Sequence, residues 1–242
     1  YLIKDIDLLS GSKDLSVAAN YSLKMTDTQG VGMGYTVMSG LGVQLVNADN
    51  NAYSNDLLIT ETNGNNAAGT TSSNAGRITL VSDIDQKSGT LDLTSSANYA
   101  AQWVGVTNND RIGDVNSSSG GGLGVQFVNM DNENFANDLL ITASMFDANS
   151  KTNNGAVFLI RDINGVNGQK ALNSTSNYTT KWNGASNGDN LGMTWSSGQG
   201  VQLVNIDNES FANDLLLTAV VADVNSKTDN GVVYLIRDIN GI

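Results

Sequence analysis

One stretch of this chain occurs twice at full length and a third time in a diverged form. Gly124–Gly165 and Gly200–Gly241 are each 42 residues long and agree at 31 positions without a gap. A third copy begins at Gly42 with GVQLVNADNNAYSNDLLIT and resumes at Gly76 with GRITLVSDID. Self-similarity at a fixed period is typical of repeat architectures, in which each unit buries apolar surface against its neighbours. The chain is therefore expected to be a tandem array of one structural unit.

The segment YLIKDID at Tyr1 gives the period of the repeat. It recurs at Thr79, Phe158 and Tyr234, at spacings of 78, 79 and 76 residues. We therefore divide the chain into repeats of about 78 residues, which are 1–78, 79–157 and 158–233, with 234–242 as the first strand of a next repeat.

Each period is predicted to hold about four β-strands. In the third period they are expected at Phe158–Ile163, at Tyr178–Trp182, within a hairpin region Gly192–Asn205, and at Asp214–Ala222. Apolar residues come in short runs rich in Val, Ile and Leu, bounded by Gly, Asn and Asp, as in strands. The chain contains no Pro, which suits strands that all hydrogen bond in ladders. The sequence thus predicts an all-β fold of tandem four-stranded β-propeller-like blades, or a stacked β array.

The residue types that are missing exclude most catalytic chemistry. The chain has no His and no Cys, so it cannot form a Ser-His-Asp triad, a Cys nucleophile or a Cys/His metal site. Its net charge of −12 argues against binding to nucleic acid or to anionic membrane surfaces. No apolar run is long enough for a transmembrane span, so we expect no membrane insertion in this segment. These features favour a non-enzymatic, secreted or cell-surface protein of bacterial type.

Three acidic loops are the candidate metal sites. The candidate ligands are Asn47, Asp49, Asn51 and Asp56 in the first loop, Asn129, Asp131, Glu133 and Asp138 in the second, and Asn205, Asp207, Glu209 and Asp214 in the third. Hard cations such as Ca²⁺ bind six to eight oxygen atoms, which alternating Asp, Asn and Glu side chains in a tight loop can supply. Glu133 and Glu209 make the second and third loops better sites than the first.

The same loops have an alternative interpretation without metal. Asp and Asn side chains commonly cap turns and accept hydrogen bonds from backbone amides. The loops also lack the Gly that normally lets a backbone fold around an ion. If the loops bind no metal, Tyr53, Phe135 and Phe211 are expected to anchor them in their repeats. The sequence leaves both interpretations open.

Two further residue sets recur with the period. The pairs Lys4-Asp5, Ser82-Asp83, Arg161-Asp162 and Arg237-Asp238 are predicted to connect neighbouring strands or repeats. Trp103 and Trp182 occupy matching positions, where the first copy has Met25. We expect them to pack between repeats. Stacking on a sugar in a lectin-like site is the alternative.

Four motifs recur in a fixed order within the periods. They are a Met-Gly or Leu-Gly strand opening (Met33–Val37, Leu191–Trp195), Asp-Leu-Leu after each acidic loop, a Gly-x-Val strand (Gly155–Leu159, Gly231–Leu235), and Leu91–Thr94 followed by Trp103–Gly105. In this order they resemble the FG-GAP repeats of integrin-α-type β-propellers, especially the bacterial ones. The acidic loops depart from that family's pattern because they lack its central Gly. The resemblance implies propeller blades, Ca²⁺ in the acidic loops and a role in adhesion.

Three blades cannot close a ring, because propellers need at least four. We therefore expect the repeats to belong to a larger or oligomeric propeller, with two chains forming six blades as one arrangement. The predicted function is an extracellular scaffold or adhesion protein that binds a protein or glycan surface or self-associates into a filament or ring. The alternatives are a carbohydrate-binding propeller and an accessory propeller of a larger secreted enzyme.

Overall fold

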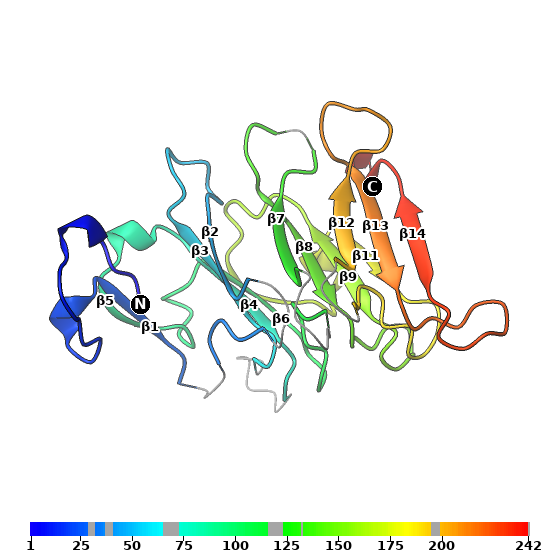
Figure 1. Ribbon diagram of the computed structural model, residues 1–242, viewed down its shortest axis with the longest axis horizontal. Helices are drawn as coiled ribbons and strands as arrows, with labels where there is room; N and C mark the ends of the chain where they lie inside the picture. The colour runs from blue at the N-terminus through cyan, green and yellow to red at the C-terminus, as the bar shows by residue number, and fades with distance from the viewer. Residues whose placement is uncertain are drawn as a thin grey trace.

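The computed structural model describes residues 1–28, 32–36, 41–64, 73–115, 123–131, 133–194 and 199–241. In these ranges the chain forms fourteen strands in four sheets and five short 3-10 helices, which confirms the all-β prediction. The sheets follow one another along the long axis of the molecule, with the first and last at opposite ends (Figure 1). None of the described helices has the length and apolar character that crossing a membrane requires.

The two middle sheets share one antiparallel meander. The first contains β2 (Val43–Val46), β3 (Asp56–Glu61), β4 (Arg77–Val81) and β6 (Ala101–Val104). The second contains β7 (Val125–Val128), β8 (Asp138–Ala143), β9 (Ala156–Ile160) and β11 (Thr180–Asn183). The register repeats as well, because Leu58 lies opposite Leu80 just as Leu140 lies opposite Leu159.

The sheets at the two ends contain parts of the same meander. At the C-terminal end, β12 (Val201–Val204), β13 (Asp214–Ala219) and β14 (Val232–Ile236) form three antiparallel strands. At the N-terminal end, β1 (Leu23–Thr26) pairs in parallel with β5 (Gly89–Asp92). An isolated antiparallel bridge joins Leu2 to Leu23. In the next repeat the equivalent pair is Leu80 and Ala101, so Tyr1–Ile3 takes the place of the third meander strand.

The short helices lie between these strands. They are η1 (Ile6–Leu8), η2 (Ala18–Asn20), η3 (Ile84–Gln86), η4 (Thr175–Asn177) and η5 (Ile239–Gly241). η1, η3 and η5 occupy equivalent positions, just after the strand segment that sets the period of the repeat.

One recurring strand was not predicted. β10 (Gly168–Ala171) pairs in parallel with β6 of the preceding sheet, as β5 pairs with β1. Its sequence GQKA has no apolar alternation, so its position depends on pairing with the earlier repeat. The residues on either side of it, Ile163 and Leu172, are fully buried between the two sheets. Each repeat therefore also covers the edge of its predecessor.

The predicted strands of the third period overlap β9, β11 and β13, and β12 lies within the predicted hairpin region. Residues 195–198 of the predicted hairpin region lie outside the described residues, and so do Val37 and Trp195 of the strand openings. The repeat boundaries at 78, 157 and 233 fall inside β4, β9 and β14, so the sequence period and the sheets are out of phase.

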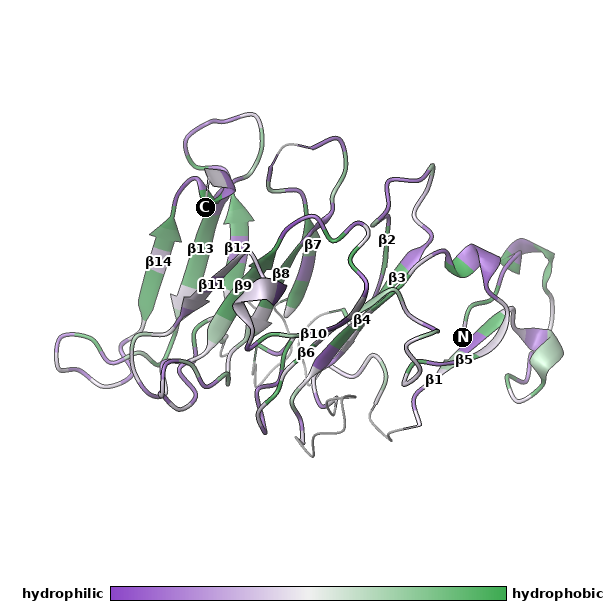
Figure 2. Ribbon diagram, turned by 180° about the vertical axis from the view of Figure 1, so that it is seen from behind, coloured by the Kyte–Doolittle hydropathy of each residue, from purple (hydrophilic) through white to green (hydrophobic). Residues whose placement is uncertain are grey.

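The core consists of three apolar layers between four stacked sheets. Side chains alternate along a strand, so Leu140 and Leu159 face one neighbouring sheet while Ile141 and Phe158 face the other. The first layer, around Leu23 and Ile59, joins the N-terminal pair of strands to the first meander. The central strands are mostly apolar, whereas the connecting loops are mostly polar (Figure 2).

Two glycines bring the start of each meander against the preceding loop. A Cβ atom on Gly200 would lie 1.9 Å from the carbonyl oxygen of Gly192, and a Cβ on Gly124 would lie 1.7 Å from that of Gly113. Backbone atoms cannot move aside as a flexible side chain can. The Leu-Gly and Gly-Val-Gln motifs of the sequence therefore meet because only glycine allows this approach.

Substitution of Gly200 by Ala is expected to destabilise the fold by about 3 kcal/mol or more, because the new methyl group overlaps backbone. Gly241→Ala is the matched control, since nothing lies within 4 Å of a Cβ there. The control is expected to stay within about 0.5 kcal/mol of the wild type. Urea unfolding followed by circular dichroism measures both, and equal stabilities of the two variants would contradict the steric explanation.

Candidate functional site

The three acidic loops occupy the same place in each meander. They connect its first two strands, which are β2 to β3, β7 to β8, and β12 to β13. The loops rise side by side at one edge of the row of sheets (Figure 1). Whatever chemistry one loop performs is therefore presented three times along the same edge.

A buried Asp at the start of the second strand organises each loop. Asp56, Asp138 and Asp214 are all fully buried. One carboxylate oxygen accepts a hydrogen bond from a loop amide, namely that of Ala48 at 2.7 Å, Met130 at 2.8 Å or Ile206 at 3.0 Å. The other oxygen accepts one from the segment after the third strand, namely from Asp83 at 2.9 Å, Asp162 at 3.1 Å or Asp238 at 3.0 Å. The same carboxylate thus ties two chain segments together in every repeat.

The segment after the third strand supplies a further carboxylate. Asp83, Asp162 and Asp238 adopt a left-handed backbone with φ of 52°, 52° and 54°. Asp tolerates this conformation better than most residues. The residue that follows each of them donates its amide to the carbonyl of Asn55, Asn137 or Asn213 at 2.8 Å. The αL turn therefore directs the third carboxylate back toward the acidic loop.

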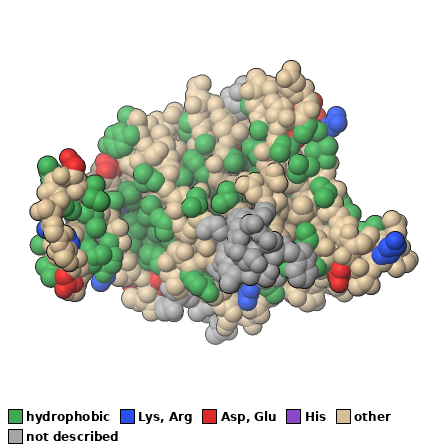
Figure 3. Space-filling model, viewed as in Figure 1, with side chains coloured by type: hydrophobic (Ala, Val, Ile, Leu, Met, Phe, Trp, Pro, Cys, Tyr) green, Lys and Arg blue, Asp and Glu red, His purple; other side chains and the backbone are tan. Residues whose placement is uncertain are grey.

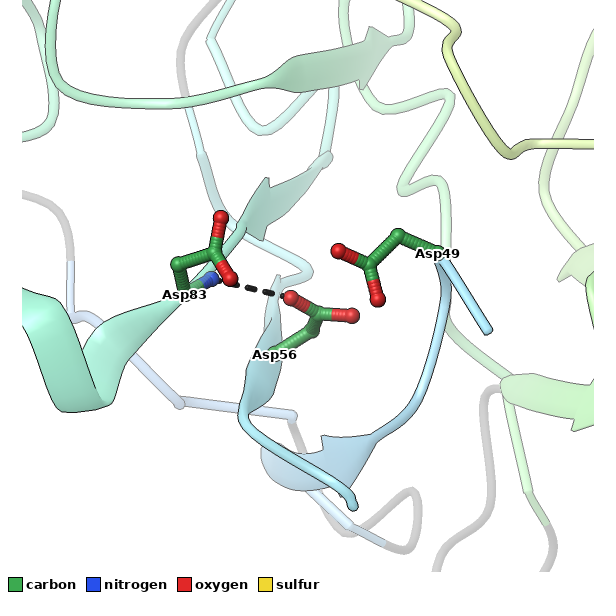
Figure 4. A group of neighbouring side chains, drawn as sticks. All are labelled: Asp49, Asp56 and Asp83. Carbon is green, nitrogen blue, oxygen red and sulfur yellow. Dashed lines mark hydrogen bonds between the residues drawn. The ribbon is translucent and has the colours of Figure 1, made fainter. Parts of the chain in front are cut away.

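Three carboxylates converge in each repeat as a result. The groups are Asp49, Asp56 and Asp83; Asp131, Asp138 and Asp162; and Asp207, Asp214 and Asp238. Within each group one oxygen of every residue lies within 4.8 Å of the others. Figure 4 shows the first group, with Asp49 from the loop and Asp83 from beyond β4 pointing toward Asp56.

Sequence reasoning found two of the three carboxylates in each group. It treated Asp83, Asp162 and Asp238 only as links between strands or repeats, because they lie more than twenty residues from their partners. The available signal was their recurrence with the same period as the loops. Their neighbours do link repeats as predicted, since Lys4 donates to the carbonyl of Asp85 and Arg161 to that of Ile239.

The other predicted ligands lie around each group. Asn47, Asn129 and Asn205 donate to the carbonyls of Asn51, Glu133 and Glu209, which closes the loop on itself. The side chains of Glu133 and Glu209 accept hydrogen bonds from Asn137 and Asn213, at 2.9 Å and 2.5 Å. In the first loop the amide of Asn51 instead donates to Asn55 at 2.8 Å. These residues therefore form a hydrogen-bonded shell beside the three carboxylates.

In the second group, electrostatic repulsion and burial make it unfavourable for all three carboxylates to be ionised without a cation. Burial raises the pKa of Asp138, and the charges of Asp131 and Asp162 raise it further, while two backbone amides oppose the shift. A bound cation would reverse this balance by favouring the ionised form. Protonation of Asp138 and cation binding are therefore expected to compete.

Several oxygen atoms of the loops have unused hydrogen-bonding capacity. Within the described part of the chain, Oδ1 of Asn129, Asp131, Asn137 and Asn213 is buried without a hydrogen-bond partner. Buried polar atoms are normally satisfied, so each such atom calls for an explanation. The donor set is oxygen only, which suits a hard cation. Asp131, Asp138 and Asp162 could hold such an ion.

A further pair of buried ionisable side chains lies at the end of the first meander. Nε of Arg77 donates to Oε2 of Glu61 at 2.6 Å, and the guanidinium also contacts Asp27. Burial raises the pKa of Glu61 and lowers that of Arg77, because both charges are removed from water, while their contact opposes both shifts. The equivalent cross-strand pairs in the other meanders are Ala143 with Ala156 and Ala219 with Val232. The ion pair is thus specific to the first repeat.

The two recurring tryptophans pack between sheets. Trp103 is fully buried in the layer between the first and second meanders, and Trp182 packs against the next layer. This placement agrees with the packing interpretation. Stacking on a sugar would require Trp103 to leave the core.

No family model matches this chain, and no curated protein sequence matches it.

The structural role of the buried Asp can be tested in the third loop. Asp214→Ala leaves the amides of Ile206 and Asp238 without their acceptor, so we expect a loss of about 2–4 kcal/mol in a chelator-containing buffer. Asp207→Ala is the control, because Asp207 is exposed in the same loop. The control is expected to change stability by less than about 0.5 kcal/mol. A near-neutral Asp214→Ala in urea unfolding would show that its hydrogen bonds contribute little.

Proposed function

We propose that this chain is a non-enzymatic repeat scaffold whose acidic loops hold divalent cations, with Ca²⁺ as the ion. The observation that carries the proposal is the threefold recurrence of the same carboxylate group at one edge of the molecule. The buried Asp at the start of the second strand (Asp56, Asp138 or Asp214), which we call the closing Asp, also accepts the same backbone hydrogen bonds in every repeat.

The recurrence is informative because the repeats have diverged elsewhere. The first repeat has a buried Arg77–Glu61 pair where the others have small apolar residues, and its β3–β4 connection has a different length. Its three carboxylates nevertheless occupy the same positions as in the other two repeats. Turn capping explains why the closing Asp is present in every repeat, because both of its carboxylate oxygens accept hydrogen bonds from backbone amides. In the first repeat Asp49 also caps the amide of Asn51, and Asp83 and Asp162 accept hydrogen bonds from Asn55 and Asn137 at 3.2 Å. These bonds leave the repulsion between the three converging charges in place, whereas a bound cation would offset it.

The chemistry of the loops favours Ca²⁺ over other ions. The chain has no His or Cys, so Zn²⁺ and other ions that prefer nitrogen or sulfur lack their usual ligands. Ca²⁺ accepts flexible sets of six to eight oxygens, whereas Mg²⁺ demands a near-ideal octahedron. Carboxylates from two segments together with Asn and Glu side chains suit the larger ion.

We interpret the antiparallel meanders as propeller-type blades of the FG-GAP kind, an interpretation supported by the strand order β7-β8-β9-β11 of the second meander and by the sequence motifs. The scaffold would act outside the cell or on its surface and present its loops to a protein or glycan partner. The acidic charge and the absence of Cys agree with such a location.

Calcium is expected to raise the thermal stability of the protein. A ligand that binds only the folded state at 100 times its dissociation constant adds about 2.7 kcal/mol per site. For a chain of this size each kcal/mol corresponds to roughly 2–4 °C in Tm. Differential scanning calorimetry with Ca²⁺ and with a chelator measures the difference. Identical melting curves in the two buffers would show that the acidic loops bind no Ca²⁺.

The variant Asp131→Asn distinguishes the effect of a bound cation on stability from the effect of repulsion between the carboxylates. The substitution keeps a side chain of similar shape. It leaves in place the hydrogen bonds that the backbone amides of Met130 and Asp162 donate to Asp138. In chelator the variant is expected to be at least as stable as the wild type, because one repelling charge next to Asp138 is gone. In Ca²⁺ it is expected to lose part of the calcium-dependent gain in Tm. A variant destabilised equally in both buffers would instead assign Asp131 a purely structural role.

A further inference from the structure

The outer face of the last sheet is apolar and exposed. In β12–β14 and the acidic loop between β12 and β13, the side chains that point away from the core include Ile206, Leu216, Val233 and Leu235, which we call the tail face. Ile206 is 44 % exposed, Val233 68 % and Leu235 45 %. The strands that carry these residues are among the most apolar in the molecule (Figure 2).

The equivalent residues of the other sheets are all buried against a following sheet. Val157 and Leu159 of the second meander are 0 % exposed because the last sheet covers them. Ile78 and Leu80 of the first meander are 0 % and 2 % exposed because the second meander covers them. The tail face is thus one side of an interface that the molecule already builds twice.

A glutamine marks the same interface. Nε2 of Gln44 donates to the carbonyl of Val125 at 3.2 Å, and Nε2 of Gln126 donates to that of Val201 at 2.9 Å. Each bond runs from the first strand of one meander to the first residue of the next meander. The third equivalent, Gln202, donates instead to the nearby carbonyl of Gln199 at 3.3 Å.

The opposite end of the molecule exposes the other side of this interface. Val43 and Leu45 on β2, which we call the head face, are 49 % and 58 % exposed. The equivalent Val125 and Val201 are 3 % and 1 % exposed, because a preceding meander covers each of them. A hollow lined by Leu2, Leu45, Tyr53 and Ile84 lies beside the head face. Figure 3 shows hydrophobic side chains gathered at this N-terminal end, on the left.

The incomplete sheets at the two ends are complementary. The five-stranded sheet has the order β2-β3-β4-β6-β10. The last sheet holds equivalents of the first three strands, and the N-terminal pair β1 and β5 holds equivalents of the other two. Joined, they give β12-β13-β14-β1-β5, which is the same sheet with the same strand directions.

We propose that the tail face of one copy docks on the head face of a second copy, so that β14 pairs with β1 and completes this sheet. Leu235 then lies opposite Leu23, as Leu159 lies opposite Thr180. Val233 and Leu235 cover Val43 and Leu45, and Gln202 donates to the carbonyl of Val43. The association is head-to-tail, and therefore closes into a ring or extends into a filament.

One segment must leave to allow this pairing. Leu2 occupies the edge of β1 that β14 would take. An isolated bridge to Leu23, packing against the first apolar layer and contacts of the Tyr1 ring with Tyr21 and Lys24 hold it there. The residues that follow it are weakly packed, with Ile6 74 % and Leu8 79 % exposed. The equivalents of Ile6, which are Ile84, Ile163 and Ile239, are all buried. Displacement of Tyr1–Ile3 breaks its contacts with β1 and with the first apolar layer, and Tyr234 and Leu235 of the docking copy, the equivalents of Tyr1 and Leu2, would replace them.

Sedimentation equilibrium of the 242-residue chain tests the proposal. The wild type is expected to rise with concentration from 25.4 kDa to at least twice that mass. Val233→Lys/Leu235→Lys blocks the tail and Val43→Lys/Leu45→Lys blocks the head, so each variant alone is expected to stay at 25.4 kDa. Mixed in equal amounts, the two variants retain one intact head and one intact tail. The mixture is expected to form a dimer and nothing larger.

Val17→Lys is the matched control. Val17 is exposed, and its equivalents Ser95 and Ser174 are exposed although their own repeats are covered. This variant is expected to associate like the wild type, and circular dichroism confirms that every variant is folded. A wild type that stays monomeric at all concentrations overturns the proposal. A head variant that still dimerises alone also overturns it, because that result indicates tail-to-tail packing. A mixture of the two variants that stays monomeric overturns it as well.

Discussion

Each of the two middle sheets has two apolar faces, and it can bury both only between two neighbours. This constraint explains why Leu140 and Leu159 face one layer while Ile141 and Phe158 face another. It also explains the parallel strands β5 and β10, which cover the outer edge of the preceding sheet. Burial of apolar area is the dominant favourable term in folding, so the stability of one repeat depends on the presence of the next. The repeats are therefore expected to fold as a row rather than singly.

Within this row, the position of each acidic loop depends on a buried carboxylate. Asp138 accepts one amide from its own loop and one from the segment beyond β9, and its burial makes those bonds costly to lose. The same two bonds bring Asp131 and Asp162 toward it. The acidic group therefore arises from the hydrogen bonding that fixes the hairpin. A cation bound there would stabilise the connection that holds the third strand against the first two.

The repeat, the all-β class and the strands β9, β11, β12 and β13 followed from the sequence because they rest on local patterns. Short runs such as LLLTAVV indicate strands without reference to the rest of the chain. β10 could not be found in that way, because GQKA has no pattern of its own and forms a strand by pairing with β6. Asp162 was missed as a member of the acidic group for a related reason. Its position depends on a left-handed turn and on a hydrogen bond to a residue 24 positions away.

The charged pair of the first repeat shows how far the repeats can vary without changing the fold. Glu61 and Arg77 stand opposite each other where Ala143 and Ala156 do in the next meander. A buried ion pair and a pair of small apolar residues can substitute for each other, since the desolvation cost of the charges offsets much of their attraction. The apolar positions that face another sheet do not vary in this way, and Val157 and Ile78 are both fully buried. Val233 keeps that apolar character although no described residue covers it, as expected for a face selected to contact another sheet.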